Sequence, residues 1–346
     1  MGRHSAGGTT SVLDRSVPAA SDTRLPATPS QLRMTAFAMI GLALFVVAMV
    51  ASYSGAFANP TLHRLEVAVV GSDQAVNALA EQEALRVNRV DDDDAARQAV
   101  YERRADTAFV ITPAGELKIY IAGGGGRSVA TAAEKVGQAA AAQLHLRPVV
   151  DDIAPTASGN PSGTVEFYAV IFLSIGASGG AAAFNMIIGK VGTLARFAWR
   201  TLTLLGYSAL LAAAVTVYVH AVLDTDLGHQ WQMFAALWLY ALAVAGAITG
   251  LGAAAGTIAS VVLTLFLVIV GNAAAAGPVG RPLLSGFYAT LNEVVPQGSG
   301  VSLLRSIEYF GGNGSFAAIA TLLVWGAAGL ALAVVAFLRS RIAERS

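Results

Sequence analysis

Hydrophobic and polar positions fall in long blocks along the chain rather than in short periods. Met34 to Phe57 carries no charged side chain and is long enough to cross the roughly 30 Å of a bilayer's hydrocarbon core as a helix. After a polar stretch, further apolar blocks predict five more spanning helices, at about 167–189, 201–223, 231–251, 255–271 and 315–337. The pattern therefore predicts a polytopic α-helical membrane protein with six transmembrane helices in 1+5 order.

The N-terminal segment 1–33 is polar and rich in Ser, Thr, Pro and Gly, so we expect a disordered cytoplasmic arm. A cleaved signal peptide is the alternative for 34–57, because Ala56-Phe57-Ala58 resembles a small-residue cleavage site. The long polar lead and the length of the apolar block favour a retained helix.

Between the first and second apolar blocks, residues 58–165 have the character of a water-soluble domain. Short apolar or alternating runs at 65–70, 85–90, 107–112 and 117–121 predict strands, the last two as a hairpin. Helical patterns at 72–86, 91–104 and 128–144 complete the order βαβαββα, which is typical of a small α/β domain. The proline-containing segment 148–163 is expected to be a linker.

Composition supports the membrane class. Hydrophobic residues make up 55% and charged residues 13% of the chain, and mean hydropathy is +0.60. The formal net charge is zero, so no electrostatic case for nucleic acid arises. The absence of cysteine excludes a disulfide framework and cysteine metal sites. Arginine far outnumbers lysine and Ala and Gly are abundant, which is typical of a GC-rich bacterial genome.

Basic residues orient the predicted helices. With the N-terminus inside, ten Lys or Arg lie in cytoplasmic segments, and apart from the translocated domain only Arg281 and Arg305 lie outside. We therefore expect a multi-pass protein of the bacterial cytoplasmic membrane with both termini, including the tail 341–346, in the cytoplasm. Residues 58–165 and the loop 272–314 would be extracytoplasmic.

Catalytic, cofactor-binding and metal-binding motifs are not evident in the sequence. Asp91 to Asp94 lacks the alternating ligands of a calcium loop and is expected to begin a solvated helix. Gly123 to Gly126 is not a phosphate loop, and GxxxxGK[ST] occurs nowhere. Because no Asp, Glu, Lys or Arg lies in the middle of a span, a self-sufficient ion-coupled carrier is disfavoured. A proton-coupled exporter acting through His220 stays as a minor alternative. We expect no enzyme activity and no cofactor in this chain.

Two loops are candidates for function. The segment 189–200 is short, basic and aromatic, through Lys190, Arg196, Trp199 and Arg200. It is either a positive-inside anchor or a short helix that docks on a cytosolic partner.

The second loop, 281–311, is too polar to span and too apolar for an ordinary solvated loop. Two short amphipathic pieces broken at Pro296-Gln297-Gly298, lying at or dipping into the lipid boundary, fit this pattern. The candidate outer-mouth residues are Pro296, Gly298, Arg305, Glu308 and Tyr309. Arg305 is either an interfacial anchor or a partly buried charge that meets anionic head groups or Glu308.

Several segments together resemble the membrane subunit of a type-2 ABC exporter, related to the phage-infection protein family. The helix, translocated domain and five-helix order is similar, over about residues 34–340. Within the domain, LEVAVVG (65–71) and AARQAVYERRADTAFVIT (95–112) resemble family segments. The outer loop is similar through FY (287–288), VVPQGSGV (294–301), LLR (303–305) and YFGG (309–312).

The resemblance implies a pathway built from two permease copies or homologues, driven by a separate cytosolic ATP-binding subunit. Residues 189–200 would contact that subunit, and 281–311 would form re-entrant or surface helices at the outer side. The cargo would be an amphiphilic drug, lipid or envelope component, and membrane lipid would surround the dimer. The alternative is a non-transporting envelope membrane protein whose outer α/β domain binds or senses a ligand or partner.

Overall fold

The computed structural model describes residues 28–188, 193–223 and 229–343, and the fold is mostly helical with one small sheet. Six helices in this part of the chain are long and apolar enough to cross a membrane. They are α1 (Pro29–Phe57), α5 (Val165–Ile188), α6 (Leu194–Leu223), α7 (Gln230–Ala255), the run Thr257–Ala274 that begins with α8 (Thr257–Phe266), and α12 (Ser315–Ala343). The prediction of a polytopic α-helical membrane protein is confirmed at this level.

The chain divides into two units, Met1–Val46 and Val47–Ser346. In the first, α1 begins five residues before the expected position, inside the segment assigned to the arm. Thr28 and Gln31 explain the start: the Thr28 hydroxyl accepts the Gln31 N–H at 3.3 Å, and the Gln31 side chain accepts the Thr28 N–H at 2.8 Å. This is a capping box, with Pro29 at the first helical position. Residues 1–27 lie outside the described part.

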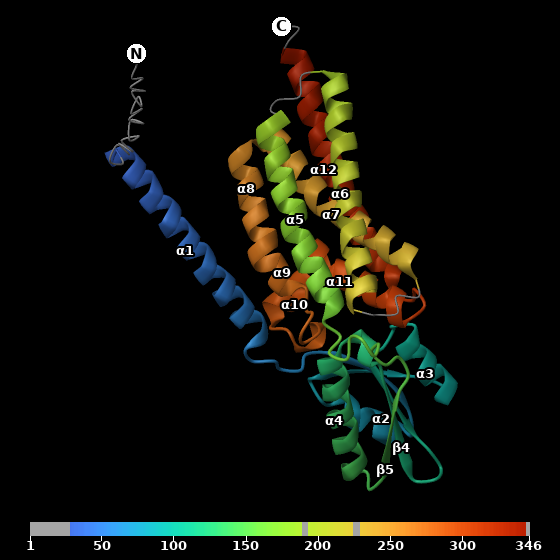
Figure 1. Cartoon of the computed structure of the whole chain (residues 1–346). Helices are drawn as coiled ribbons and strands as arrows, with labels where there is room; N and C mark the ends of the chain where they lie inside the picture. The colour runs from blue at the N-terminus through green and yellow to red at the C-terminus, as the bar shows by residue number, and fades with distance from the viewer. Residues whose placement is uncertain (1–27, 189–192, 224–228, 344–346) are drawn as a thin grey trace, which may run out of the picture. The chain divides into compact units, whose positions relative to one another are not determined.

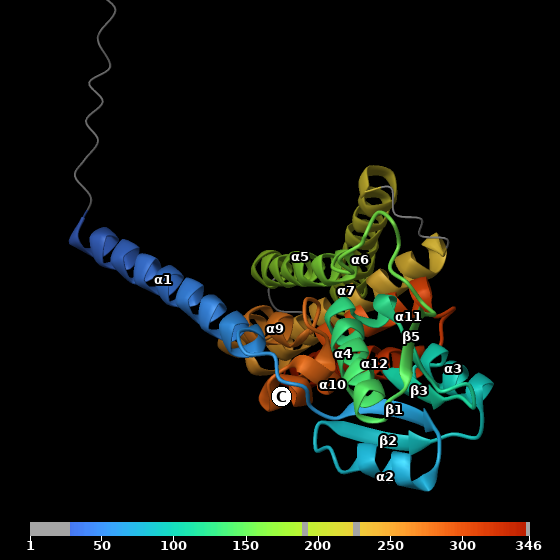
Figure 2. The same ribbon diagram turned by 90° about the horizontal axis from the view of Figure 1, so that it is seen from below.

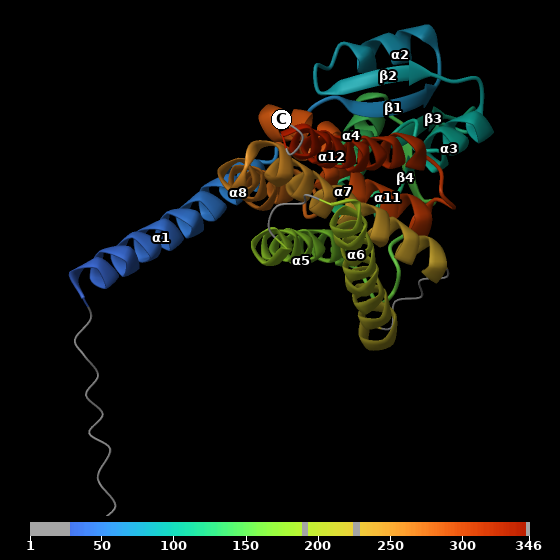
Figure 3. The same ribbon diagram turned by 90° about the horizontal axis from the view of Figure 1, so that it is seen from above.

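In the second unit, α7 lies at the centre of the bundle and contacts α5, α6, α8, α11 and α12 (Figures 1 and 3). Small residues permit the close α7–α12 crossing. A Cβ on Gly250 would lie 2.0 Å from the Gly329 carbonyl oxygen, and one on Gly329 would lie 2.4 Å from Gly246. The four-residue spacing of Gly246 and Gly250 therefore serves packing within the chain.

The sheet has five strands in the order β2-β1-β3-β4-β5. The strands are β1 (Leu65–Val70), β2 (Leu85–Arg89), β3 (Thr107–Ile111), β4 (Glu116–Ile121) and β5 (Arg147–Asp152). β1 pairs in parallel with β2 and β3, whereas β3 and β4 form the expected antiparallel hairpin, with Phe109 opposite Ile119. The predicted α/β character is confirmed.

β5 corrects the prediction that 148–163 is a linker. Residues 147–152 pair in parallel with β4, from Glu116 opposite Arg147 to Ile121 opposite Asp152. Pro148 is tolerated because β5 is an edge strand, and most of its side chains are exposed. The connecting segment to α5 therefore begins only after Asp152.

Helices cover both faces of the sheet (Figure 2). α2 (Asp73–Ala80) and α4 (Arg127–Gln143) pack on the face that carries Val67 and Ile119. α3 (Asp93–Tyr101) packs on the opposite face, where Ala108 and Tyr120 lie. Leu283 completes the first core and Phe310 the second, so both residues of the stretch 281–311 belong to the sheet's hydrophobic cores.

The stretch 281–311 forms the short turn η3 (Arg281–Leu283), α10 (Gly286–Val294) and α11 (Pro296–Tyr309). Two helical pieces were expected, and the break falls at Val295, whose extended backbone precedes Pro296. α11 does not lie on a surface: most of its residues, from Pro296 to Ser306, are buried against α5, α7 and α12. Two positions were expected for these pieces, at the lipid boundary or dipping into it. The surface position is wrong for α11, because its small residues allow it to enter the bundle.

Candidate functional site at the junction of the sheet and α11

Arg305 connects three separate segments of the chain. Its guanidinium donates to the carbonyl of Gly125 at 3.1 Å, of Gly163 at 3.0 Å and of Gly277 at 3.0 Å. These carbonyls belong to the turn after β4, the segment before α5 and the segment after α9 (Asn272–Ala274). Arg305 is 4% exposed, so it is a buried charge and not an interfacial anchor. Burial lowers the pKa of its guanidinium.

The glycine run 123–126 permits this approach. Gly123 to Gly125 form the 3₁₀ turn η1, which contacts α11. A Cβ on Gly124 would lie 2.3 Å from the Tyr309 ring, far closer than two carbon atoms can approach. The run is therefore the element that lets the sheet meet α11, a role that the sequence did not indicate.

Asn160, Glu166 and Tyr309 form a hydrogen-bonded group beside Arg305. The Tyr309 hydroxyl donates to Glu166 Oε1 at 2.7 Å, and Asn160 Nδ2 donates to the same oxygen at 2.8 Å. Asn160 Oδ1 accepts the backbone N–H of Thr164 at 3.0 Å, at the start of α5. Burial first, and then the neighbouring carboxylates, raise the pKa of Tyr309, so its hydroxyl stays protonated.

Glu308 lies beside Glu166, and neither Glu308 Oε1 nor Glu166 Oε2 has a hydrogen-bond partner among the other described groups, so the two carboxyl groups are placed to share a hydrogen bond. Two carboxyl groups can share a hydrogen bond only when one is protonated. Burial, and next the contact with Glu166, raise the pKa of Glu308 well above its usual range. We assign the proton to Glu308, which leaves the Glu166 carboxylate to balance the charge of Arg305.

Arg103 makes a second connection between the sheet and α11. Its Nη1 donates to the Ser302 carbonyl at 2.8 Å and to the Ser306 hydroxyl at 2.5 Å, and its guanidinium lies 5.1 Å from the centre of the Phe310 ring. Burial, with the nearby Arg305 charge, lowers the pKa of Arg103 to about 10, so it stays cationic at neutral pH.

At the other end of α11, Gln297 enters the bundle core. Its Nε2 donates to Ser174 Oγ at 3.2 Å and to the Leu267 carbonyl at 3.0 Å. That carbonyl lies in a π-helical turn, Leu267–Gly271, and such turns release backbone groups from the regular helical pattern. Gly271 makes room, because a Cβ there would lie 2.6 Å from Gln297 Oε1.

The candidate coupling segment 189–200 contains both exposed and buried residues. Arg196 and Trp199 are exposed on the first turns of α6, whereas Arg200 is 9% exposed. Arg200 donates to Asn185 of α5 and, at 3.4 Å, to the Thr249 carbonyl of α7. Asn185 in turn donates to Ser260 of α8 at 3.4 Å. Arg200 thus joins helices, and Lys190 lies outside the described residues.

Three of the five outer-mouth residues, Arg305, Glu308 and Tyr309, come together in one cluster. Pro296 begins α11, and Gly298 lies against the Asn292 backbone, where a Cβ would approach the carbonyl oxygen to 2.1 Å. Sequence reasoning missed Asn160, Glu166 and Arg103 as members. Glu166 carried a signal, since a carboxylate directly before a long apolar block needs a partner when buried.

Among the described residues, no group of three or more His, Asp or Glu could hold a metal ion. Comparison of the chain with protein-family models, with curated proteins and with solved structures finds no match. The site's chemistry must therefore be argued from its own residues, which bind polypeptide segments to one another and hold a proton.

Proposed function

We propose that this chain is the membrane-spanning permease subunit of an ABC-type exporter, which moves an amphiphilic molecule across a bacterial cytoplasmic membrane with a separate ATPase. The observation that carries the proposal is α11. It is a helix too short and too polar to span, buried between α5, α7 and α12, and its end is bonded to the sheet by Arg103 and Arg305. Such a helix connects an outer domain mechanically to the bundle.

The proposed topology has six spans in 1+5 order, with the sheet domain outside and both termini inside. The distribution of Lys and Arg supports this orientation. The junction is consistent with it: Glu166 at the start of α5 lies near Glu308, Tyr309 and Arg305 of α11, and Arg305 is bonded to the turn after β4. They would close the outer end of a pathway.

The proposed coupling end is the first part of α6. Arg196 and Trp199 are exposed there and are available to a cytosolic subunit, whereas Arg200 joins α6 to α5 and α7. A docked subunit that moved the start of α6 would act on Arg200 and so on the neighbouring helices. Two copies of the chain, or one copy and a homologue, would form the pathway.

Affinity purification of the full chain from its native membrane tests the proposal. We expect a cytosolic Walker-A ATPase to co-purify, and Arg196→Glu to lower its recovery at least tenfold. Arg339→Glu is the matched control, because Arg339 is also exposed and lies on the same proposed side. Recovery of the chain without an ATPase in every detergent would contradict the proposal.

The alternative is a non-transporting envelope protein whose sheet domain binds or senses a ligand. The extent of the junction argues against it. Leu283 and Phe310 complete the sheet's two cores, so the domain is built into the bundle, whereas a tethered sensor needs only one anchoring helix. The same purification decides between them, since a sensor would not retain an ATPase through α6.

A further inference from the structure

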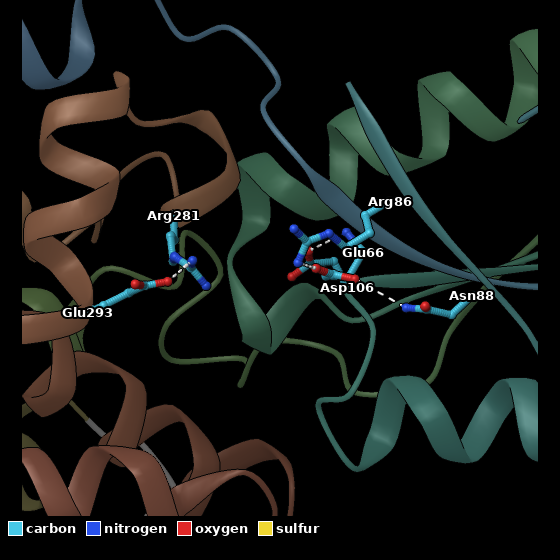
Figure 4. Close-up of polar contacts among 6 residues, drawn as sticks. All are labelled: Glu66, Arg86, Asn88, Asp106, Arg281 and Glu293. Carbon is cyan, nitrogen blue, oxygen red and sulfur yellow. Dashed lines mark hydrogen bonds and ion pairs between the residues drawn. The ribbon is translucent and has the colours of Figure 1, made fainter. Parts of the chain in front are cut away.

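A cleft of about 890 Å³ lies between the sheet and the helices α10, α11 and α12. Figure 4 shows part of its polar lining, with Arg281 and Glu293 on one side and Glu66, Arg86 and Asp106 on the other. This volume is in the range of sites that hold a small molecule or part of a lipid.

The polar wall has an excess of positive charge. Six arginines and three carboxylates line the cleft, an excess of three positive charges before His63 is counted. The arginines are Arg64, Arg86, Arg103, Arg104, Arg281 and Arg305, and the carboxylates are Glu66, Asp106 and Glu293. A cleft with one sign of charge and low-dielectric walls concentrates ions of the opposite sign.

Four of these arginines are available to a ligand, among them Arg104, whose ion pair with Glu102 is exposed. Arg64 makes no ion pair with any residue that the structure describes, and Arg281 and Arg86 hold only exposed pairs, with Glu293 and Glu66. Exposed pairs contribute little free energy, so a bound anion can replace them. Arg103 and Arg305 are instead committed to α11 and to backbone carbonyls.

Small apolar side chains also line the cleft and are called here the apolar wall: Ala275 and Ala276 after α9, Ala289 of α10, Val301 of α11, and Ala317 and Ala318 of α12. Uncharged polar residues of α10 to α12 accompany them: Thr290, Asn292, Ser299, Ser302 and Thr321. Beside it, Phe287 of α10 and Phe316 of α12 are exposed, 63% and 84%, as residues in contact with lipid would be. The cleft therefore has both cationic and apolar lining, and exposed phenylalanines are sequence neighbours of its lining residues Gly286 and Ala317.

We propose that this cleft binds an anionic amphiphile, with a phosphate or similar head group at Arg64, Arg86 and Arg281 and the acyl chain along the alanine wall of α12. Guanidinium groups bind phosphate through paired N–H···O bonds, and the excess of positive charge in the lining favours a head group with a net negative charge over a zwitterionic one. The proposal rests on the proposed function only for placing the cleft at the outer leaflet, where it would receive or release cargo.

The test is native mass spectrometry of the full chain in detergent, with dioleoyl phosphatidylglycerol, dioleoyl phosphatidylcholine or inorganic phosphate as the added probe. We expect the anionic lipid to bind in preference to phosphatidylcholine. The double variant Arg64→Gln with Arg281→Gln should lower its affinity on the order of fivefold, because two exposed charged contacts are lost. Added salt should lower the affinity as well.

The matched control is Arg89→Gln with Arg127→Gln, which removes two exposed arginines, paired with Asp73 and Asp152, outside the cleft lining. It should leave lipid binding unchanged. In the opposite direction, Glu293→Gln frees Arg281 and should strengthen binding. A lack of preference for the anionic lipid, or equal losses in both double variants, would overturn the proposal.

A tail variant separates a lipid from a free phosphate. Ala317 is exposed and lines the apolar wall, so Ala317→Phe should lower phosphatidylglycerol binding and leave phosphate binding unchanged, whereas Ala327→Phe, outside the lining, should change neither. Phosphate binding with no effect of Ala317→Phe on the lipid would reduce the cleft to an anion site. None of these measurements needs an ATPase, so their failure is distinct from failure of the proposed function.

Discussion

At the scale of single residues, Arg305 holds three segments of the chain together. A buried guanidinium is costly unless every donor finds an acceptor and the charge is balanced. Three backbone carbonyls and the nearby Glu166 carboxylate meet most of that need, although the Nε donor has no partner among the described residues. The residue therefore fixes an arrangement of segments more than it adds stability in the way an apolar side chain would.

Arg305→Met should destabilise the folded chain by about 3–5 kcal/mol, because three carbonyls lose their donor and the Glu166 charge is left uncompensated. Arg147→Met is the control: its pair with Glu116 is exposed on the arginine side, and its loss should cost less than about 1 kcal/mol. Thermal unfolding in detergent, followed by tryptophan fluorescence, measures both. Equal midpoints for the two variants would contradict the assigned role.

Glu308 predicts how stability changes with pH. Its pKa in the folded chain is raised by burial and by Glu166, so the folded state holds a proton that the unfolded state releases near its ordinary pKa of about 4.3. Stability should therefore fall as pH rises from that value toward the raised pKa. Glu308→Gln should flatten this fall, since glutamine mimics the protonated form.

Asp106 contributes in the same direction, because burial raises its pKa to about 6. The fall in the free energy of unfolding that Asp106 causes should end near that pH, and Asp106→Asn should abolish it. Above pH 6, any further fall in the free energy of unfolding is assigned to Glu308. Unfolding midpoints between pH 5 and 8 for the wild type and both variants separate the two, and an unchanged slope above pH 6 in Glu308→Gln would refute the shared proton.

At the scale of elements, the turn η1 and the helix α11 depend on each other. The turn supplies the Gly125 carbonyl to Arg305, and Gly124 supplies the space that the Tyr309 ring occupies. The Tyr309 hydroxyl in turn reaches Glu166 at the start of α5. One glycine turn thus determines whether α11, α5 and the sheet can meet.

Gly124→Ala should destabilise the chain by about 1–3 kcal/mol, because the added methyl group forces the Tyr309 ring out of its position. Gly206→Ala is the matched control: nothing lies within 4 Å of a Cβ there, in the interior of α6, so the change should be neutral or slightly stabilising. The measurement is the unfolding midpoint. A drop for Gly206→Ala as large as that for Gly124→Ala would show that the contact is not responsible.

The sequence predicted elements whose pattern is set locally. The apolar blocks and the first four strands are confirmed because lipid and the sheet interior each demand a continuous or alternating apolar face. The edge strand β5 was missed, since RPVVDD is mostly exposed and carries a proline. The start of α1 was misplaced because its capping box lies in a segment with the composition of a disordered arm.

Only part of the candidate site could be predicted from the sequence, because local pattern does not identify distant partners. Arg305, Glu308 and Tyr309 lie close together in the sequence and were named. Glu166 and Asn160 reach Tyr309 only by tertiary packing, across 143 and 149 residues. Arg103 reaches Ser302 and Ser306 of the same helix across 199 and 203 residues. No local pattern specifies such partners.

At the scale of the whole molecule, Leu283 and Phe310, which lie between α9 and α12 in the chain, pack into the two hydrophobic cores of the sheet. Arg103 and Arg305 add polar bonds at the same junction. A transport step that tilted α11 would therefore move the sheet as well, and would change the shape of the cleft between them. The proposed function requires this junction to lie on the extracytoplasmic side and the first turn of α6 to lie on the cytoplasmic side of the membrane.

The most direct measurement is the accessibility of single cysteines in intact cells, which is simple because the chain has no cysteine of its own. Lys135 of α4 and Arg196 of α6 are both exposed positions. The account predicts that Lys135→Cys reacts with a membrane-impermeant maleimide in intact cells, and that Arg196→Cys reacts only after permeabilisation. Labelling of both from the same side, or the reverse pattern, would contradict it.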